Sequence, residues 1–336
     1  MSDALLQIST AAILLGALVL YAVTGGADFG GGVWDLLARG PRAARQRDVI
    51  AHALGPIWEA NHVWLILVVV LLFVGFPRAF AALATDLHIP LAVMLIGVVL
   101  RGTAFTFRSY GGGTDSDLRF WGRVFAISST VTPLTLGLCA GAVASGALRI
   151  DPKTGLVATD FVSSWTSPVA LAVGVLALAL FAFLGAVYLT LETTDTDLQD
   201  DFRRRALAAG VVVFACSAAA LLLARRDAPA LFEGLTQGPG RVAFQIATGT
   251  AAIAAFAALA SRRFRLARAA AAVQVGLVVA GWGLAQFPLL IPPDLGLANT
   301  AAPASVLRPM LATLGVGSLL LGPAFLYLFR VFKGRK

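Results

Sequence analysis

The sequence predicts an all-α integral membrane protein with about nine transmembrane helices. Three observations predict this fold class: 58% of the 336 residues are hydrophobic, only 13% are charged, and the mean hydropathy is +0.84. A spanning helix needs roughly 20 apolar residues, so about nine helices use some 180 residues and leave about 150 for connections. This composition excludes a soluble globular protein and a protein with a single membrane anchor.

The spans follow one another as apolar windows separated by charge clusters or by Gly and Pro residues. No connection is long enough for a soluble domain, so residues 1–336 are expected to form a single polytopic membrane domain. No Lys or Arg precedes the first window, which favours a retained helix over a cleaved signal peptide. We expect helices near 4–24, 56–76, 80–107, 121–147, 165–191, 206–224, 242–260, 267–290 and 305–332.

The basic residues predict how the chain is oriented in the membrane. With nine spans the connections alternate between two sides, and 19 of the 26 Lys and Arg residues fall on one side. Cytoplasmic segments are enriched in Lys and Arg, so the N-terminus is expected outside and the C-terminus in the cytoplasm. The net charge of +8 then reflects topology and not nucleic-acid binding. Cys139 and Cys216 fall inside apolar windows, which favours packed small hydrophobes over a disulfide or a thiolate metal site.

Ionisable residues inside a membrane are costly, so each of them is a functional candidate. The first helix ends in a segment from Thr24 to Asp35 in which five glycines surround Asp28. Glycines permit close backbone approach or non-helical geometry around a carboxylate. Asp28 is therefore expected to be held by the protein; the alternative is a helix end that unravels into a solvated loop.

The second helix begins with Gly55-Pro56-Ile57-Trp58-Glu59-Ala60-Asn61-His62, in which Pro56 suits the first turn. Glu59 and His62 are three residues apart and share a helix face, so they can form a carboxylate–imidazole pair that relays protons. His52 is expected on the same side, nearer the cytoplasm. In the alternative, Glu59 only complements the helix dipole and His62 is a satisfied core histidine.

The third helix carries Arg101 near its inner end and Asp86 and His88 near its outer end. Arg101 is expected near the level of Asp28 and Glu59, where it can form an ion pair with one of these carboxylates. Snorkelling of the side chain to the interface is the alternative. Asp86 and His88 are expected to face the outer solution at the interface.

Ligands for a cofactor are scarce in this sequence. It has no Cys-x-x-Cys-His motif, no cysteine cluster and no Gly-rich nucleotide loop. The three histidines, His52, His62 and His88, do not bracket a gap of the size of a haem. The chain itself is therefore expected to bind no cofactor and no metal.

Together these motifs resemble subunit II of the cytochrome bd-type quinol oxidases. The resemblance is dense in the first third of the chain and elsewhere lies mainly in the nine-helix layout. The matching residues are Gly26-Ala27-Asp28-Phe29-Gly30 with Trp34-Asp35-Leu36-Leu37, then Gly55 to Leu65, Phe73 with Gly75-Phe76-Pro77, Arg101-Gly102 with Phe105-Thr106-Phe107-Arg108, and the stretches Phe287-Pro288 and Asn299-Thr300-Ala301-Ala302-Pro303.

The resemblance implies a heterodimer in the bacterial cytoplasmic membrane. Its partner, subunit I, would carry two b-type haems, one d-type haem and the quinol site, while this subunit carries no haem. The complex would oxidise quinol at the outer side and reduce O2 to water with protons from the cytoplasm, which builds a membrane potential without a pump. A small accessory subunit and membrane lipid are further expected partners.

The resemblance also implies roles for single residues of this chain. Asp28 and Glu59, with His62, would belong to the cytoplasmic proton path, and Trp64 would lie beside an apolar O2 channel. The Glu at position 59 together with His62 is similar to the cyanide-insensitive branch. Asn61 and Arg101 are expected to support the acids. Two other interpretations are a proton-coupled transporter that uses these acids and a structural scaffold within the oxidase.

Overall fold

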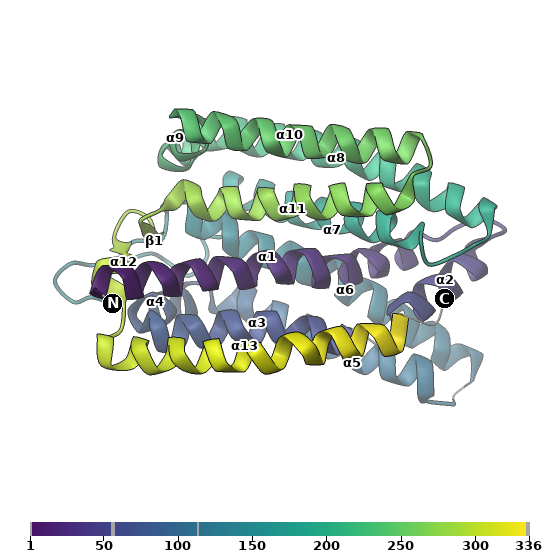
Figure 1. Cartoon of the computed structure of the whole chain (residues 1–336), viewed down its shortest axis with the longest axis horizontal. Coiled ribbons are helices and arrows are strands. Elements are labelled where there is room, and N and C mark those ends of the chain that lie inside the picture. The colour runs from purple at the N-terminus through teal and green to yellow at the C-terminus, as the bar shows by residue number, and fades with distance from the viewer. Residues whose placement is uncertain (1, 55–57, 113, 334–336) are drawn as a thin grey trace.

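The structure is a computed structural model that describes residues 2–54, 58–112 and 114–333. Long helices lie side by side along one axis, and the two ends of the chain lie at opposite ends of the bundle (Figure 1). Among the described residues, eight helices are long and apolar enough to cross a bilayer. They are α1 (Asp3–Leu36), α5 (His88–Tyr110), α6 (Asp115–Ser145), α7 (Pro168–Leu189), α8 (Thr196–Asp227), α10 (Pro239–Ala260), α11 (Phe264–Gln286) and α13 (Ala304–Lys333).

The helices α3 (Trp58–Gly75) and α4 (Pro77–Asp86) form a broken pair that bends by 117°, and this pair, counted as one span, gives the ninth. Pro77 begins α4 and has no N–H with which to continue α3, and Phe76 between them has non-helical dihedral angles. The helix expected over 80–107 is therefore divided: its first residues belong to α4, and α5 begins only at His88. The expected all-α class with about nine spans is confirmed.

Shorter elements connect the spans at the two ends of the bundle. They are α2 (Ala43–Leu54), α9 (Pro229–Thr236), α12 (Leu297–Thr300) and a hairpin of β1 (Leu289–Ile291) and β2 (Leu295–Gly296). None of these elements was expected from the apolar windows, because each is too short to cross a bilayer. The connection between α6 and α7 lies against the β-hairpin, and Arg149 is paired there with Asp294 at 3.0 Å.

The central helix α1 continues through its glycine-rich segment to Leu36, well beyond the end expected at residue 24. The reason is its contact with α7. A Cβ atom placed on Gly30 would lie 1.8 Å from the carbonyl oxygen of Phe181, and one on Gly185 would lie 2.5 Å from the backbone of Gly30. The two helices therefore touch backbone to backbone, as the expectation of close approach at the glycines required.

Candidate functional site

Asp28 of α1 and Asn61 of α3 meet inside the bundle. The Nδ2 atom of Asn61 donates a hydrogen bond to Oδ2 of Asp28 at 2.5 Å, with Asn61 buried and Asp28 half-buried. The unbroken helix of α1 places this carboxylate two turns before Asp35, so it does not lie in an unravelled loop. The two motifs of the sequence thus form one site.

Glu59 lies in the first turn of α3, two residues before Asn61. Its side chain lies outside the part of the chain that the structure describes, and so do residues 55–57. The pairing of Glu59 with His62 therefore stays a prediction.

His62 is surrounded by aromatic rings of α1. Its ring centroid lies 5.9 Å from that of Tyr21 and 6.0 Å from that of Phe29, and both contacts are edge-on. Tyr21 is buried and lies seven residues before Asp28, which puts both residues on the same side of α1. The imidazole therefore lies in the same cluster as the carboxylate.

Arg101 of α5 also belongs to this cluster. Its side chain is only 2% exposed, and its guanidinium carbon lies 4.8 Å from the ring centroid of Phe29 and 5.1 Å from that of Phe125. Its Nε atom donates to Oγ of Ser129 at 3.1 Å, and its charge interacts with that of Asp28. The side chain thus points into the protein and does not snorkel to the interface.

Tyr21 and Ser129 are two members of this cluster that the sequence did not single out. Ser129 belongs to a row of buried hydroxyl residues on α6, together with Ser128, Thr132 and Thr135. Such a row, at helical spacing in an otherwise apolar segment, was the available signal.

Asp35 forms a second charged level, seven residues after Asp28. The side chain of Asp35 is 3% exposed, and Nη1 of Arg108 lies 2.9 Å from its Oδ2 atom. Arg47 of α2 approaches the same carboxylate at 3.9 Å. The neighbouring Trp34 donates from Nε1 to the carbonyl oxygen of Ala182 in α7 at 2.7 Å. The end of α1 is therefore fixed to α2, α5 and α7.

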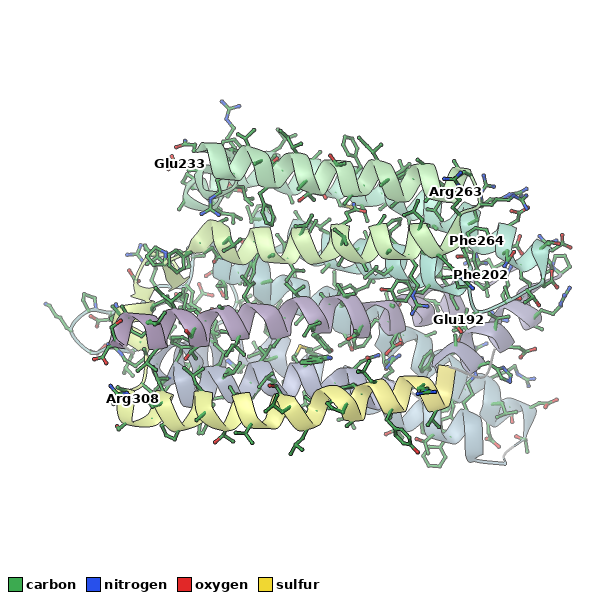
Figure 2. All side chains as sticks on the ribbon, viewed as in Figure 1. Glu192, Phe202, Glu233, Arg263, Phe264 and Arg308 are labelled. Atoms are coloured by element: carbon green, nitrogen blue, oxygen red, sulfur yellow. The ribbon has the colours of Figure 1, made fainter. Side chains whose placement is uncertain are left out.

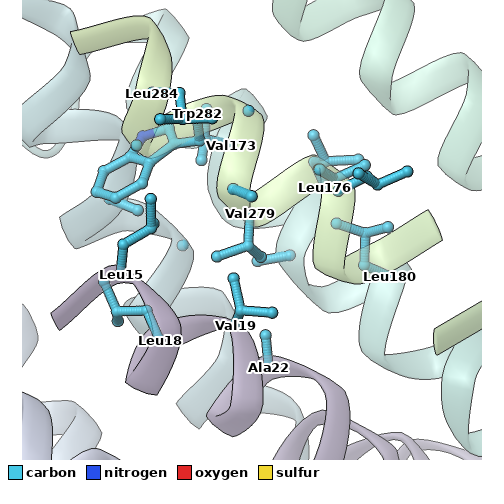
Figure 3. Close-up of a pocket in the computed structure, with 18 of the residues that line it drawn as sticks. Leu15, Leu18, Val19, Ala22, Val173, Leu176, Leu180, Val279, Trp282 and Leu284 are labelled. Carbon is cyan, nitrogen blue, oxygen red and sulfur yellow. The ribbon is translucent and has the colours of Figure 1, made fainter. Parts of the chain in front are cut away.

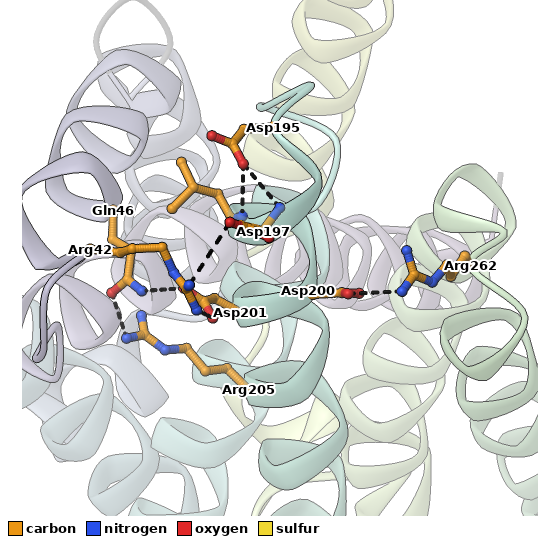
Figure 4. A network of polar contacts seen from close by, with 9 residues as sticks. Arg42, Gln46, Asp195, Asp197, Asp200, Asp201, Arg205 and Arg262 are labelled. Carbon is orange, nitrogen blue, oxygen red and sulfur yellow. Dashed lines mark hydrogen bonds and ion pairs between the residues drawn. The ribbon is translucent and has the colours of Figure 1, made fainter.

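Near this end a polar network connects α2 with α8 (Figure 4). Asp201 of α8 accepts hydrogen bonds from Nε and Nη2 of Arg42 at 2.8 and 2.6 Å and from Nε2 of Gln46 at 2.8 Å. The Oε1 atom of Gln46 accepts from Arg205 at 2.7 Å. The hydrogen bonds to Asp201 and its negative charge raise the pKa of Arg42.

Further charged residues gather at both ends of the bundle. Figure 2 shows Arg263 and Glu192 at the end that carries α2, and Arg308 and Glu233 at the other end. Asp86, which was expected to face the outer solution, is instead buried at the end of α4. Its Oδ2 atom accepts a hydrogen bond from Ser164 at 2.5 Å, because the connection between α6 and α7 covers it.

An apolar cavity of about 1690 Å³ runs between α1, α7 and α11 (Figure 3). Leu65 and Val68 of α3 also line it. The indole of Trp64 itself stacks on Phe325 of α13, with ring centroids 5.5 Å apart. Trp64 therefore lies on α3 immediately before a residue of the cavity wall.

Comparisons with known proteins agree with this architecture. A family model described as cytochrome bd terminal oxidase subunit II matches residues 6–332. A putative cytochrome bd menaquinol oxidase subunit II of Bacillus subtilis is 26% identical over 98% of this chain and 96% of that protein. Cytochrome bd-I ubiquinol oxidase subunit 2 of Escherichia coli is 29% identical over 62% of this chain and 54% of that protein.

A solved structure has the same fold. A chain of the bd oxidase from Geobacillus thermodenitrificans superimposes with a TM-score of 0.83, at 18% identity, over 98% of this chain and 99% of that chain. The family match covers nearly the whole chain, including both motifs that meet at Asp28 and Asn61. The chain therefore belongs to the cytochrome bd terminal oxidase subunit II family.

Proposed function

We propose that this chain is the haem-free subunit II of an electrogenic quinol oxidase and supplies part of its cytoplasmic proton inlet. Members of its family are subunits of cytochrome bd quinol oxidases, which are oxidoreductase complexes with haems and a subunit I. The observation that carries the inlet is the hydrogen bond from Asn61 to Asp28, inside a bundle of membrane-spanning helices. Holding a carboxylate there costs free energy, so Asp28 is a functional candidate.

Depth within the helix supports an entry role for Asp28. It lies eight residues before Leu36, the last residue of α1, which is about 12 Å along the helix axis. Water at this end of the bundle is thus about two helical turns away. A proton route must begin in water and continue through groups that accept and release protons, and Glu59 and His62 are the next candidates on α3.

Arg101 supports the charged form of the site. Its buried guanidinium interacts with Asp28, and an opposite charge favours the ionised form of a carboxyl group. A carboxylate that is ionised between turnovers can accept the next proton. The aromatic rings of Phe29 and Phe125 shield Arg101 from water, which keeps this interaction strong.

The haem-free assignment is supported by the places of the histidines. His52 lies exposed on α2, His62 lies against Tyr21 and Phe29, and His88 lies exposed at the far end of the bundle. Among the described residues, no group of three or more His, Cys, Asp or Glu side chains is placed to hold a metal ion. The haems of the complex are therefore assigned to subunit I.

The cavity is the best candidate for an O2 path, because O2 is apolar and dissolves preferentially in apolar surroundings. Its wall at Leu65 and Val68 lies next to Trp64. The proposed orientation places the N-terminus outside a bacterial cytoplasmic membrane and the C-terminus inside. It is supported by the arginines of α2, which lie at the opposite end of the bundle from the N-terminus. A cytoplasm-specific reporter fused after residue 336 should be active.

Asp28→Asn and Glu59→Gln in the assembled oxidase test the inlet. Both variants should turn over roughly 100-fold more slowly, at the lower end of the range that positioned proton transfer contributes to a rate, with unchanged haem spectra. Asp3→Asn, at the other end of α1, is the matched control and should retain normal turnover. Normal turnover of both site variants would contradict the inlet and leave a scaffold role.

A further inference from the structure

We propose that Asp201 of α8 is a positioning residue for the proton inlet, acting through Gln46 of α2 and through Arg42, which immediately precedes α2. This inference rests on the proposed function and adds a part of the chain to it. Asp201 does not touch Asp28 or Asn61. Its influence would pass through α2, which joins the two helices that carry the site.

Asp201 joins α8 to the beginning of α2 through several short hydrogen bonds. One carboxylate accepts three hydrogen bonds of 2.6–2.8 Å, two of them from the planar guanidinium of Arg42 in a two-point arrangement. The side chain of Asp201 is only 14% exposed. Gln46 is buried and bonded on both sides, because its oxygen accepts from Arg205.

One edge of α2 carries Gln46 and Ile50, and Arg42 lies in line with them just before the first helical residue, Ala43. Arg42, Gln46 and Ile50 are spaced four apart, so they share a face, and Ile50 is fully buried in the main core. Exposed charged residues occupy other faces of this short helix. Ile50 supplies its apolar anchor, and the contacts with Asp201 fix the beginning of the helix.

A neighbouring side of α2 is bound to the end of α1 through Arg47. Arg47 lies 3.9 Å from the carboxylate of Asp35 and donates to the carbonyl oxygen of Ala38 at 2.9 Å. α2 is therefore clamped between Asp201 of α8 and the end of α1. The indole of Trp34 completes the clamp, since the guanidinium of Arg205 lies 5.3 Å from its ring centroid.

A shift of α2 would displace the beginning of α3, which carries Asn61 of the inlet. Only residues 55–57 separate its last residue, Leu54, from Trp58, the first residue of α3. Asn61 follows within one turn and makes the short hydrogen bond to Asp28. Misplacing a site by about 1 Å can cost up to about 100-fold in rate, so a loosened clamp should slow proton delivery without removing any proton-carrying group.

The test uses Asp201→Asn in the assembled oxidase, with Asp200→Asn as the matched control. Asp200 is the preceding residue, but it pairs with Arg262 at 2.8 Å, away from α2. Turnover is measured against pH, since proton delivery limits the rate most when protons are scarce. We expect Asp201→Asn to be roughly 3- to 10-fold slower at alkaline pH, with smaller loss at acidic pH and with the KM for quinol and the haem spectrum unchanged.

An alkaline rate of Asp201→Asn equal to that of Asp200→Asn would overturn the inference. Should Asp201→Asn not assemble, Arg42→Gln tests the same contact from its more exposed side, and a normal alkaline rate there is equally contrary.

These outcomes are distinguishable from those of the inlet itself. A slow Asp28→Asn variant beside a normal Asp201→Asn variant overturns only the positioning role. Normal rates in both variants overturn the proposed inlet together with the inference that rests on it.

Discussion

Asp35 and Arg108 join α1 to α5 by a two-point ion pair, with Nη1 to Oδ2 at 2.9 Å and Nη2 to Oδ1 at 3.4 Å. Seven residues earlier on the same two helices, Asp28 and Arg101 also interact through their charges. The helices thus carry opposite charges at two matching levels, two turns apart. The pair of Asp35 and Arg108 fixes the helix ends, and the pair of Asp28 and Arg101 belongs to the candidate inlet.

Replacing Asp35 by Ala should destabilise the protein. The change leaves the guanidinium of Arg108, which is 19% exposed, without its main partner, at a cost of about 1–3 kcal/mol. Thermal unfolding of the detergent-solubilised complex measures the effect. The double variant Asp35→Ala with Arg108→Ala should lose less than the sum of the two single changes, and strict additivity would contradict a direct pair.

Gly30→Ala should impair assembly of the bundle. The added Cβ atom would meet the carbonyl oxygen of Phe181 at 1.8 Å, so α1 and α7 would have to separate, at a cost of about 1–3 kcal/mol or more. Gly16→Ala on the same helix is the control, because no atom lies within 4 Å of its added Cβ. Equal amounts of folded protein from both variants would show that the close approach does not matter.

Asn61→Ala should slow the oxidase roughly 3- to 10-fold, because Asp28 loses the donor that orients it. Thr24→Ala, one turn before Asp28, serves as the control, since its hydroxyl only bonds Leu20 of its own helix. Turnover and haem content of the two variants are compared in the assembled complex. A normal rate for Asn61→Ala would show that the hydrogen bond from Asn61 does not contribute to turnover.

The connection between α6 and α7 should loosen in acid. Asp160 accepts hydrogen bonds from the backbone N–H groups of Val162 and Ser163 at 3.0 and 2.9 Å, and hydrogen bonding to Ser163 lowers its pKa. A lowered folded pKa stabilises the turn above the unfolded value of about 3.9, and this stabilisation is lost as pH falls through the folded pKa. The Val162 and Ser163 amides should therefore be protected from hydrogen exchange at neutral pH and lose this protection as the pH falls through the lowered pKa of Asp160.

At neutral pH, Asp160→Asn should mimic the acid state for the same two amides. Exchange that stays slow in this variant would mean that other contacts hold the turn. Asp151 also has a lowered pKa, through its bond with the N–H of Lys153, but it lies in a separate turn. Asp151→Asn should leave Val162 and Ser163 protected.

The sequence predicted the spans because apolar length and the distribution of arginines are local properties of the chain. It could not predict where α1 ends. The glycines around Asp28 suggested either close packing or an unwound end, and the choice depends on Gly185, which lies in a different helix. Helix α2 has only 12 residues and a polar composition, so apolar windows of bilayer length do not predict it, although Gln46 and Ile50 follow a helical spacing.

The sequence pointed to some residues of the cluster, but not to Tyr21 and Ser129 and not to how the side chains are arranged. Asp28, Asn61, His62 and Arg101 were all candidates from their unusual positions in apolar segments. Arg101 could have been turned either way, and the rings that cover it, Phe29 and Phe125, come from two other helices. Such contacts between distant segments leave no trace in local spacing.

The length of α1 has an electrical consequence. Its 34 residues make a helix about 51 Å long, whereas the hydrocarbon layer is about 30 Å thick, so the last turns reach into the headgroup region. Asp28 then lies near the edge of the insulating layer. A proton that reaches it has crossed little of the transmembrane voltage, so its occupancy should respond weakly to membrane potential. In the proposed inlet, the step that moves the proton against the field would lie deeper, beyond Asp28.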